Sequence, residues 1–268
     1  MKKILTILAI GAALTSCKND NKEANADMNS EVISPAETPQ NEMEDSATIA
    51  ITPISHATAV ITWGESVIYT DPVGGAAGFE GKEKPSFILI TDIHQDHMDA
   101  ETLKALQLAE TKIIVPKAVQ EQLPKDLQKN LVVMNNGDSQ DFMGFNIKAI
   151  PMYNLPESPD AMHTKGRGNG YVLEKDGKRL YIAGDTEDIP EMRDLKNIDV
   201  ALIPMNLPYT MTVEDAAKGV LAFKPKKVIP YHYRGKDGLS DVEKFKELVN
   251  KEDQDIDVEL LEWYPTKE

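Results

Sequence analysis

Four metal-capable side chains stand within six residues of the chain, in the order Asp92, His94, Asp96 and His97. They directly follow Phe87–Ile90, a continuous apolar run that is typical of a strand covered on both faces. Since α/β folds place their sites at the carboxyl ends of strands, this position predicts a site at a sheet edge. Imidazole and carboxylate groups in a tight turn can converge on one point and suit a borderline divalent ion. The segment therefore predicts a metal centre within an α/β fold.

The other apolar runs predict how the chain folds around this segment. Lys175-Asp-Gly-Lys178 lies between two such runs and is a strong hairpin signal. Strands that first form meanders and later alternate with helices favour two mixed β-sheets with helices on the outer faces. We therefore expect an αββα sandwich in one domain over residues 49–268. The expected helices are Asp99–Leu108, one that begins at Thr212, and Asp241–Val249, and the expected strands are Ile49–Ile51, Ala59–Ile61, Val67–Tyr69, Phe87–Ile90, Ile113–Val115, Leu131–Val133, Phe145–Ile150, Tyr171–Leu173, Leu180–Ile182, Val228–Ile229 and Val258–Leu261.

The first residues have the character of an export signal. Lys2 and Lys3 precede an apolar stretch of eleven residues, which is shorter than the about 20 residues that a membrane-spanning helix needs. The following Leu-Thr-Ser-Cys17 resembles a bacterial lipobox, in which the cysteine receives a diacylglyceryl group and the chain is cut before it. We expect residues 1–16 to be a lipoprotein signal peptide and Cys17, the only cysteine, to be lipidated. The alternative is a plain secreted protein whose free cysteine is incidental.

The segment after Cys17 predicts a tether. Residues 18–48 carry eight acidic side chains against two lysines and no aromatic residue. Such a segment cannot bury enough apolar surface to offset its ordering entropy, so we expect residues 17–48 to be the lipidated cysteine and a disordered acidic tether. Lys18 is not the aspartate associated with inner-membrane retention. We therefore expect export through the general pathway to the outer membrane of a Gram-negative cell, facing the periplasm or the surface.

The charge of the chain disfavours nucleic acid as a partner. The formal net charge is −15, and removal of Lys2 and Lys3 with the signal peptide lowers it to −17. A surface this acidic repels nucleic-acid backbones at long range. Other catalytic classes also lack their motifs, because the sequence has no Gly-x-Ser-x-Gly elbow, phosphate-binding P-loop or dinucleotide glycine fingerprint.

Several motifs together resemble the metallo-β-lactamase superfamily. The segment Asp92–His97 is similar to its His-x-His-x-Asp-His motif, with aspartate at the place of the first histidine. Asp185 follows an expected strand as the bridging aspartate of that superfamily does, and His232 follows another as its last histidine ligand does. Ser55-His56-Ala57 and Asp71-Pro72 resemble two motifs near the start of the domain. The order of motifs is most similar to the subgroup with ascorbate-6-phosphate lactonase and N-acyl-phosphatidylethanolamine phospholipase D.

One position departs from the pattern of that subgroup. Asn154 stands where its third histidine ligand is expected, and His163 follows nine residues later. We hypothesise that His163 replaces the missing imidazole, with its loop folding back over the metals. The alternatives are that Asn154 is itself a weak ligand and that Asp92 orients a histidine from behind instead of binding the metal.

The resemblance implies two divalent ions, with zinc first and manganese or iron as alternatives. Three carboxylates and a bridging hydroxide would balance two such ions, whereas the carboxylates alone would repel one another. Asp185 would be shared by the ions, and Asp96 would hold one ion and orient or deprotonate the water, so these two residues are the expected catalytic pair. The expected metal ligands are Asp92, His94, Asp96, His97, His163, Asp185 and His232.

Other polar side chains are candidates to contact a substrate. Lys165 and Arg167 lie in a glycine-rich loop and suit a phosphate or carboxylate, although solvated loop charges are the alternative. Tyr209 is a candidate to donate a hydrogen bond to an oxyanion, or else it packs in the core. His56 either packs beside the metals or contacts the substrate.

The resemblance implies a hydrolase that uses a metal-bound hydroxide on an ester, lactone or phosphodiester. The expected substrate is a small anionic or lipid-derived molecule, and we do not expect a β-lactam. The alternative is a catalytically silent metal-binding or sensing lipoprotein of the same fold, since two imidazoles of the usual set are absent from their positions. A purely structural protein would leave the histidines of the motifs unexplained.

Overall fold

The computed structural model describes residues 48–106 and 110–265. All of them lie within the unit Pro39–Glu268. The expected signal peptide (residues 1–16), the lipidation of Cys17 and the tether up to residue 47 lie outside the described residues, and these predictions stay predictions. In the described ranges, no helix combines the length and the apolar character that a membrane crossing requires.

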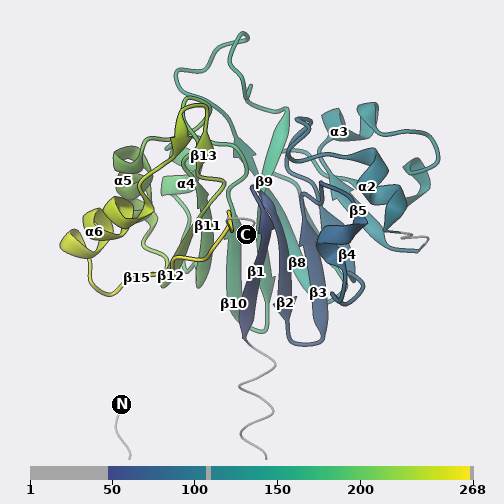
Figure 1. Cartoon of the computed structure of the whole chain (residues 1–268), viewed down its shortest axis with the longest axis horizontal. Coiled ribbons are helices and arrows are strands. Elements are labelled where there is room, and N and C mark those ends of the chain that lie inside the picture. Colours follow the sequence, from purple (N-terminus) through teal and green to yellow (C-terminus); the bar gives the residue numbers. More distant parts are fainter. Residues whose placement is uncertain (1–47, 107–109, 266–268) are drawn as a thin grey trace, which may run out of the picture. The chain divides into compact units, whose positions relative to one another are not determined.

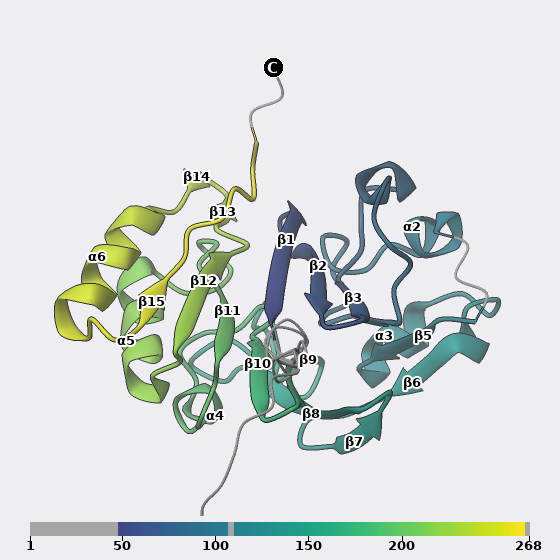
Figure 2. The same cartoon turned by 90° about the horizontal axis from the view of Figure 1, so that it is seen from below.

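Two mixed sheets pack face to face, with helices outside (Figures 1 and 2), and the expected αββα sandwich is confirmed. In the first sheet, β1 to β3 are antiparallel and β3 to β6 run parallel. Its strands, in spatial order, are β1 (Ile49–Ser55), β2 (Thr58–Trp63), β3 (Ser66–Thr70), β4 (Phe87–Leu89), β5 (Lys112–Val115) and β6 (Leu131–Val133). Outside this sheet lie α2 (Ala100–Ala105) and α3 (Lys117–Gln122), and the 3-10 turns η1 (Ala76–Phe79) and η2 (Gln128–Asn130) belong to the same half of the chain.

In the second sheet, four strands run parallel and the rest are antiparallel. Its strands, in spatial order, are β15 (Asp257–Val258), β12 (Lys227–Tyr231), β11 (Val200–Pro204), β10 (Lys178–Ile182), β9 (Gly168–Lys175), β8 (Phe145–Met152) and β7 (Ser139–Phe142). On its outer face lie α4 (Pro190–Arg193), α5 (Val213–Phe223) and α6 (Val242–Glu252). A separate hairpin is formed by β13 (Arg234–Gly235) and β14 (Gly238–Leu239).

The alternation of side chains on β4 explains why its apolar run is continuous. Phe87 and Leu89 belong to the core between the sheets, where the Phe87 ring lies 5.5 Å from that of Phe145 on β8. Ile88 and Ile90 point the other way and join the cluster beneath α2 and α3. Both faces of β4 are thus covered, so neither face needs polar side chains. This confirms the prediction of a strand buried on both faces.

Most expected elements are present, and the differences have simple causes. The hairpin at Lys175–Lys178 is confirmed as the β9–β10 turn. The expected start of α5 is also confirmed, because Thr212 is its N-cap and Asp215 N donates to Thr212 Oγ1 at 3.0 Å. The expectation of a strand over Val258–Leu261 is wrong in extent, because only Asp257–Val258 pairs with β12. Residues 107–109, at the end of the expected helix from Asp99, lie outside the described residues.

Candidate metal centre

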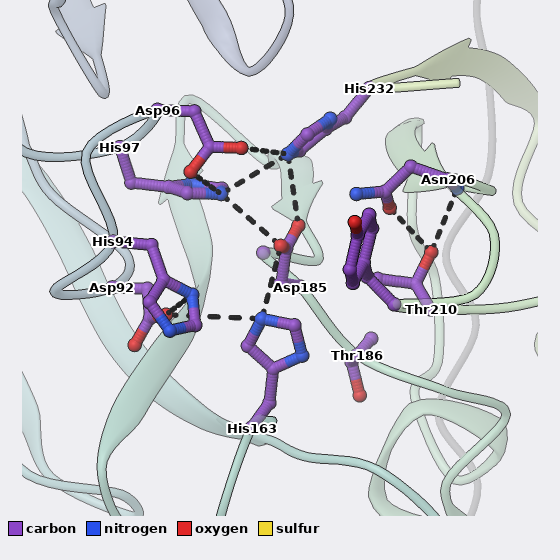
Figure 3. A network of polar contacts seen from close by, with 12 residues as sticks. Asp92, His94, Asp96, His97, His163, Asp185, Thr186, Asn206, Thr210 and His232 are labelled. Carbon is purple, nitrogen blue, oxygen red and sulfur yellow. Dashed lines mark hydrogen bonds and ion pairs between the residues drawn. The ribbon is translucent and has the colours of Figure 1, made fainter. Parts of the chain in front are cut away.

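Two groups of three potential ligands face each other across one aspartate (Figure 3). One, the Asp92 group, consists of Asp92, His94 and His163, and the other, the Asp96 group, consists of Asp96, His97 and His232. In each group the candidate ligand atoms all lie within 4.8 Å of one another. The residues come from the loops after β4, β8 and β12, so distant parts of the sequence meet at one edge of the sandwich.

Asp185, in the loop after β10, connects the two groups. Its Oδ2 lies 3.2 Å from His163 Nε2 and 3.3 Å from His97 Nε2. Its Oδ1 lies 3.4 Å from His232 Nε2. One carboxylate therefore presents an oxygen to each group, which is the placement that a bridging ligand requires.

The loop after β4 converges because it folds into a tight turn. His97 N and Met98 N both donate to His94 O, at 3.0 and 2.8 Å. This turn carries four of the candidate ligands to the centre with no intervening element. His232 reaches the centre from the opposite side, directly after β12, with a φ of 47°.

Asn154 holds His163 in place and lies outside both groups. Asn154 N donates to His163 O at 2.9 Å, and His163 N donates to Asn154 Oδ1 at 2.8 Å. The Asn154 Nδ2 donates to Glu187 Oε1 at 3.1 Å and to Tyr209 O at 2.8 Å. The structure thus brings His163 to the Asp92 group and uses Asn154 to fix the main chain of its loop.

The donor atoms fit a divalent ion on two counts. Among the described residues, both ring nitrogens of His163 and Oδ1 of Asp185 are buried without a hydrogen-bond partner. The Nε2 atoms of His97 and His232 lie only 3.2 Å apart. Two imidazoles on a tetrahedral zinc ion would place their nitrogens roughly 3.3 Å apart. The residues present therefore fit the metal that their motifs imply.

The carboxylates of the centre are held in the ionised form. Burial opposes ionisation of Asp185, but His232, His97 and the His163 ring nitrogen 3.2 Å away outweigh it and keep its pKa well below the usual range. Asp96 shows the same balance, with burial opposed by His232 and His97, and its pKa is also lowered. Ionised oxygens in a buried site are ready to bind a cation.

Asp71 supports His97 from behind. The Asp71 Oδ2 lies 2.8 Å from His97 Nδ1, and the carboxylate accepts hydrogen bonds from Thr91 N at 2.7 Å and Thr91 Oγ1 at 2.6 Å. Burial lowers the pKa of His97, but Asp185 and Asp71 raise it by more than burial lowers it. The pKa of His97 is therefore well above its usual value. A carboxylate on Nδ1 fixes the ring with Nε2 toward the metal site.

His56 supports His232 in a similar way. The His56 Nδ1 lies 3.2 Å from His232 Nδ1 and 3.1 Å from the hydroxyl of Tyr264. Burial, together with the charge on His232, lowers the pKa of His56 to about 4. The residue therefore lies beside the centre, behind one of its imidazoles.

The centre forms the floor of a cavity of about 270 Å³. The cavity is lined by His94, Asp96, Met162, His163, Asp185, Asn206 and Tyr209. Lys165 is engaged elsewhere, with its Nζ 2.8 Å from Glu191 and 3.2 Å from Glu157. Arg167 pairs with Asp92, at 2.8 Å between Nη2 and Oδ2. Both cations thus bind protein carboxylates, and their contact with a substrate stays a prediction.

Asn206 is a polar residue of this cavity that the sequence analysis missed. Asn206 N donates to Thr210 Oγ1 at 2.9 Å, so the Thr210 hydroxyl is free to donate to Asn206 Oδ1 at 2.6 Å. This fixes the orientation of the amide, and its nitrogen is directed toward the centre (Figure 3). The residue follows β11, so the rule that located the segment after Phe87–Ile90 would have found it only if Val200–Pro204 had been recognised as a strand.

Comparison with known proteins agrees with this geometry. Residues 50–232 match the family model of the beta-lactamase superfamily domain. A metal-dependent hydrolase of Thermus thermophilus is 33% identical over 186 residues, which cover 67% of this chain and 81% of the relative. One from Thermococcus onnurineus is 31% identical over 205 residues, which cover 73% and 90%.

Solved structures show the same relationship. A Parabacteroides distasonis protein described as a metal-dependent hydrolase has 39% sequence identity and a TM-score of 0.71, over 81% of this chain and 94% of its own. At 10% identity, the metallo-beta-lactamase fold protein YhfI of Bacillus subtilis still superposes with a TM-score of 0.64, which shows the shared fold. The chain belongs to the metallo-β-lactamase superfamily, among its metal-dependent hydrolases.

Proposed function

We propose that this metal-dependent hydrolase cleaves an ester or lactone bond of a small or lipid-derived molecule. The observation that carries the proposal is the position of Asp185, shared by two ligand groups on the floor of a cavity. Zinc is the proposed ion at both groups, since the donors are imidazole nitrogens and carboxylate oxygens, with manganese or iron as alternatives.

The residues of the centre have different roles in the proposed reaction. When bound, the two ions would lower the pKa of a water molecule and stabilise negative charge on the substrate oxygen. Asp96 lies 3.3 Å from His232 Nε2, and its side chain is 42% exposed, so it can accept a proton at the cavity wall. The fixed amide of Asn206 donates to the oxygen that becomes negative, and Tyr209 is placed to assist it.

The cavity favours an uncharged acyl group over a phosphodiester. The described residues that line it include no lysine or arginine, and the nearby Lys165 and Arg167 are bound to carboxylates. Met162, which is 49% exposed, adds apolar surface. The resemblance of the motifs to the lactonase of the subgroup supports the choice of lactones and other acyl esters, whereas the resemblance to its phospholipase D favours a phosphodiester. A phosphodiester or an anionic substrate is the alternative.

The test is hydrolysis of a panel of esters, lactones and phosphodiesters by the purified protein loaded with Zn²⁺ or Mn²⁺. We expect turnover of esters or lactones, and its loss together with bound metal in His94→Ala and Asp185→Asn. Glu247→Gln, an exposed carboxylate on α6, is the control and should behave as the wild type. Turnover that survives metal removal would exclude the proposal. Tight metal binding without turnover of any substrate would instead support a metal-binding or sensing lipoprotein.

We also propose that the hydrolase is a lipoprotein of the outer membrane. The lipobox at Cys17 and the acidic composition of residues 18–48 support this. An anchor of this kind would hold the cavity near lipid-derived substrates.

A further inference from the structure

Arg167 binds a member of the Asp92 group. Its Nε lies 3.1 Å from Asp92 Oδ1 and its Nη2 lies 2.8 Å from Asp92 Oδ2, so the guanidinium occupies both carboxylate oxygens. The Asp92 side chain is fully buried, and that of Arg167 is 19% exposed. A two-pronged, charge-assisted contact of this kind is strong and geometrically specific.

The start of β9 fixes this contact. Asn169 N donates to Thr91 O at 2.9 Å, so β9 begins against the residue that precedes Asp92. A Cβ on Gly168 would lie 2.8 Å from Thr91 O and 2.5 Å from the methyl group of Met152. Glycine is needed at this close approach, and the approach sets Arg167 beside Asp92. The ion pair is therefore a consequence of the fold.

Arg167 holds the same oxygen that the metal would need. Asp92 Oδ2 is 2.9 Å from His94 Nδ1 and 3.9 Å from His163 Nε2, so it is the carboxylate oxygen that faces the imidazoles. Arg167 Nη2 lies 2.8 Å from this atom. Because a guanidinium does not lose its proton in proteins, a positive charge stays beside this position.

The two groups therefore differ in charge. The negative charge of Asp92 is balanced by Arg167, so the Asp92 group is formally neutral. The Asp96 group keeps the negative charge of Asp96, and Asp71 adds another behind His97. In the described part of the chain, the ion pairs of the Asp96 group include no lysine or arginine.

We propose that Arg167 competes with the metal for Asp92, so that the centre fills in sequence. The first ion enters the Asp96 group, and the second enters the Asp92 group with lower affinity because it must share the carboxylate with a fixed cation. The proposal rests on the proposed metal centre but not on the bond that it hydrolyses. Arg167 is then a positioning residue that sets the affinity and order of metal binding.

The test is a calorimetric titration of Zn²⁺ into the metal-free purified protein. For the wild type we expect two dissociation constants, the second about tenfold or more above the first. Arg167→Gln should lower the second constant about tenfold and leave the first unchanged, because it removes the charge. Arg167→Lys keeps the charge and should stay near the wild type. Lys165→Gln removes a neighbouring loop cation that pairs with Glu191, and it should leave both constants unchanged.

Each outcome decides the proposal. An unchanged or higher second constant in Arg167→Gln would overturn it, since Arg167 would then support Asp92 as a ligand. Should that variant fail to fold, an anomalous-scattering map of the wild type at one equivalent of zinc decides instead. We expect metal in the Asp96 group alone, and equal occupancy of both groups would overturn the proposal. A protein that binds no metal would refute the centre itself, which is a separate and recognisable failure.

Discussion

Asn154 and His163 exchange two hydrogen bonds, one from each main-chain nitrogen, at 2.9 and 2.8 Å. The side chain of Asn154 also reaches Glu187 and the carbonyl of Tyr209. It therefore ties the loop of His163 to two neighbouring loops of the centre. Asn154, the position at which the resemblance predicted a histidine ligand, thus supports the loop of the candidate ligand His163, nine residues downstream.

Loss of this support should loosen His163. In Asn154→Ala we expect weaker zinc binding in the Asp92 group and a fall of about 1–3 kcal/mol in the free energy of unfolding, because buried partners lose their hydrogen bonds. Calorimetry and urea unfolding measure the two effects. Asn146→Ala removes an exposed asparagine of β8 that binds Asp141, and it should alter neither by much. Wild-type zinc affinity in Asn154→Ala would contradict the role.

Asp71 should control zinc binding in the Asp96 group through its contact with His97. In Asp71→Asn the amide cannot accept both hydrogen bonds from Thr91 and also face His97 Nδ1 as a carboxylate does. We expect zinc to bind the Asp96 group about 10- to 100-fold more weakly, as measured by competition with a chelator. Asp199→Asn is the matched control, since Asp199 is a buried carboxylate that binds Arg179 N at 2.8 Å, away from the centre. Equal losses in both variants would point to a general structural effect.

Asn206 should act on turnover and leave metal binding unchanged. Removal of one preorganised donor to a developing oxyanion costs about 10²–10³ in kcat, and we expect this in Asn206→Ala with little change in KM. Thr210→Val leaves the amide but removes the hydroxyl that orients it, so a smaller loss is expected. Metal content should equal that of the wild type in both. A normal kcat in Asn206→Ala would remove this residue from the reaction.

The ligand groups could be predicted because their residues share local patterns. The segment Asp92–His97 follows a buried strand, and Asp185 and His232 follow two others, so a rule about strand ends finds these residues. His163 lies well beyond the end of β8 and was predicted instead from the departure at Asn154. The supporting residues carry no such pattern. Asp71 reaches His97 across 26 positions of the sequence, and the partner of Arg167 lies 75 positions away. Contacts between residues so far apart in the sequence depend on how the sheets pack, and the hydrophobic periodicity of the sequence does not reveal that packing.

Some helices and strands could also be predicted from the sequence, whereas others could not. The run Val200–Pro204 is buried as β11, but the sequence analysis did not identify it, because a short apolar run does not by itself distinguish a strand from another buried segment. The four residues of α4 are too few for a helical period to be visible. A longer amphipathic helix such as α5 was predicted, because its apolar residues recur on one face over several turns.

Lipidation should depend on Cys17 alone. With radiolabelled palmitate supplied to expressing cells, we expect incorporation into the wild type and none in Cys17→Ala, since the chain has no other cysteine. The wild type should fractionate with the outer membrane, and the variant should not. Ser16→Ala changes the neighbouring residue while keeping a small side chain, and it should still be labelled. Label in Cys17→Ala would refute the predicted anchor.

His56 should make the metal-free protein less stable in mild acid. Burial and the neighbouring His232 lower its pKa from 6.5 to about 4, so the unfolded chain takes up a proton at a higher pH than the folded chain. Stability that is present above pH 6.5 is therefore lost as the pH falls through this window. The raised pKa of His97 acts in the opposite direction, since it adds stability as the pH falls toward 6.5, and it does so in the wild type and in a variant alike. His56→Asn keeps a polar group near His232 but does not titrate, so its free energy of unfolding in chelator should fall less between pH 7 and pH 4.5, as urea curves at each pH would measure. Parallel declines of the two proteins would show that His56 is protonated in the folded state and that burial does not control its charge.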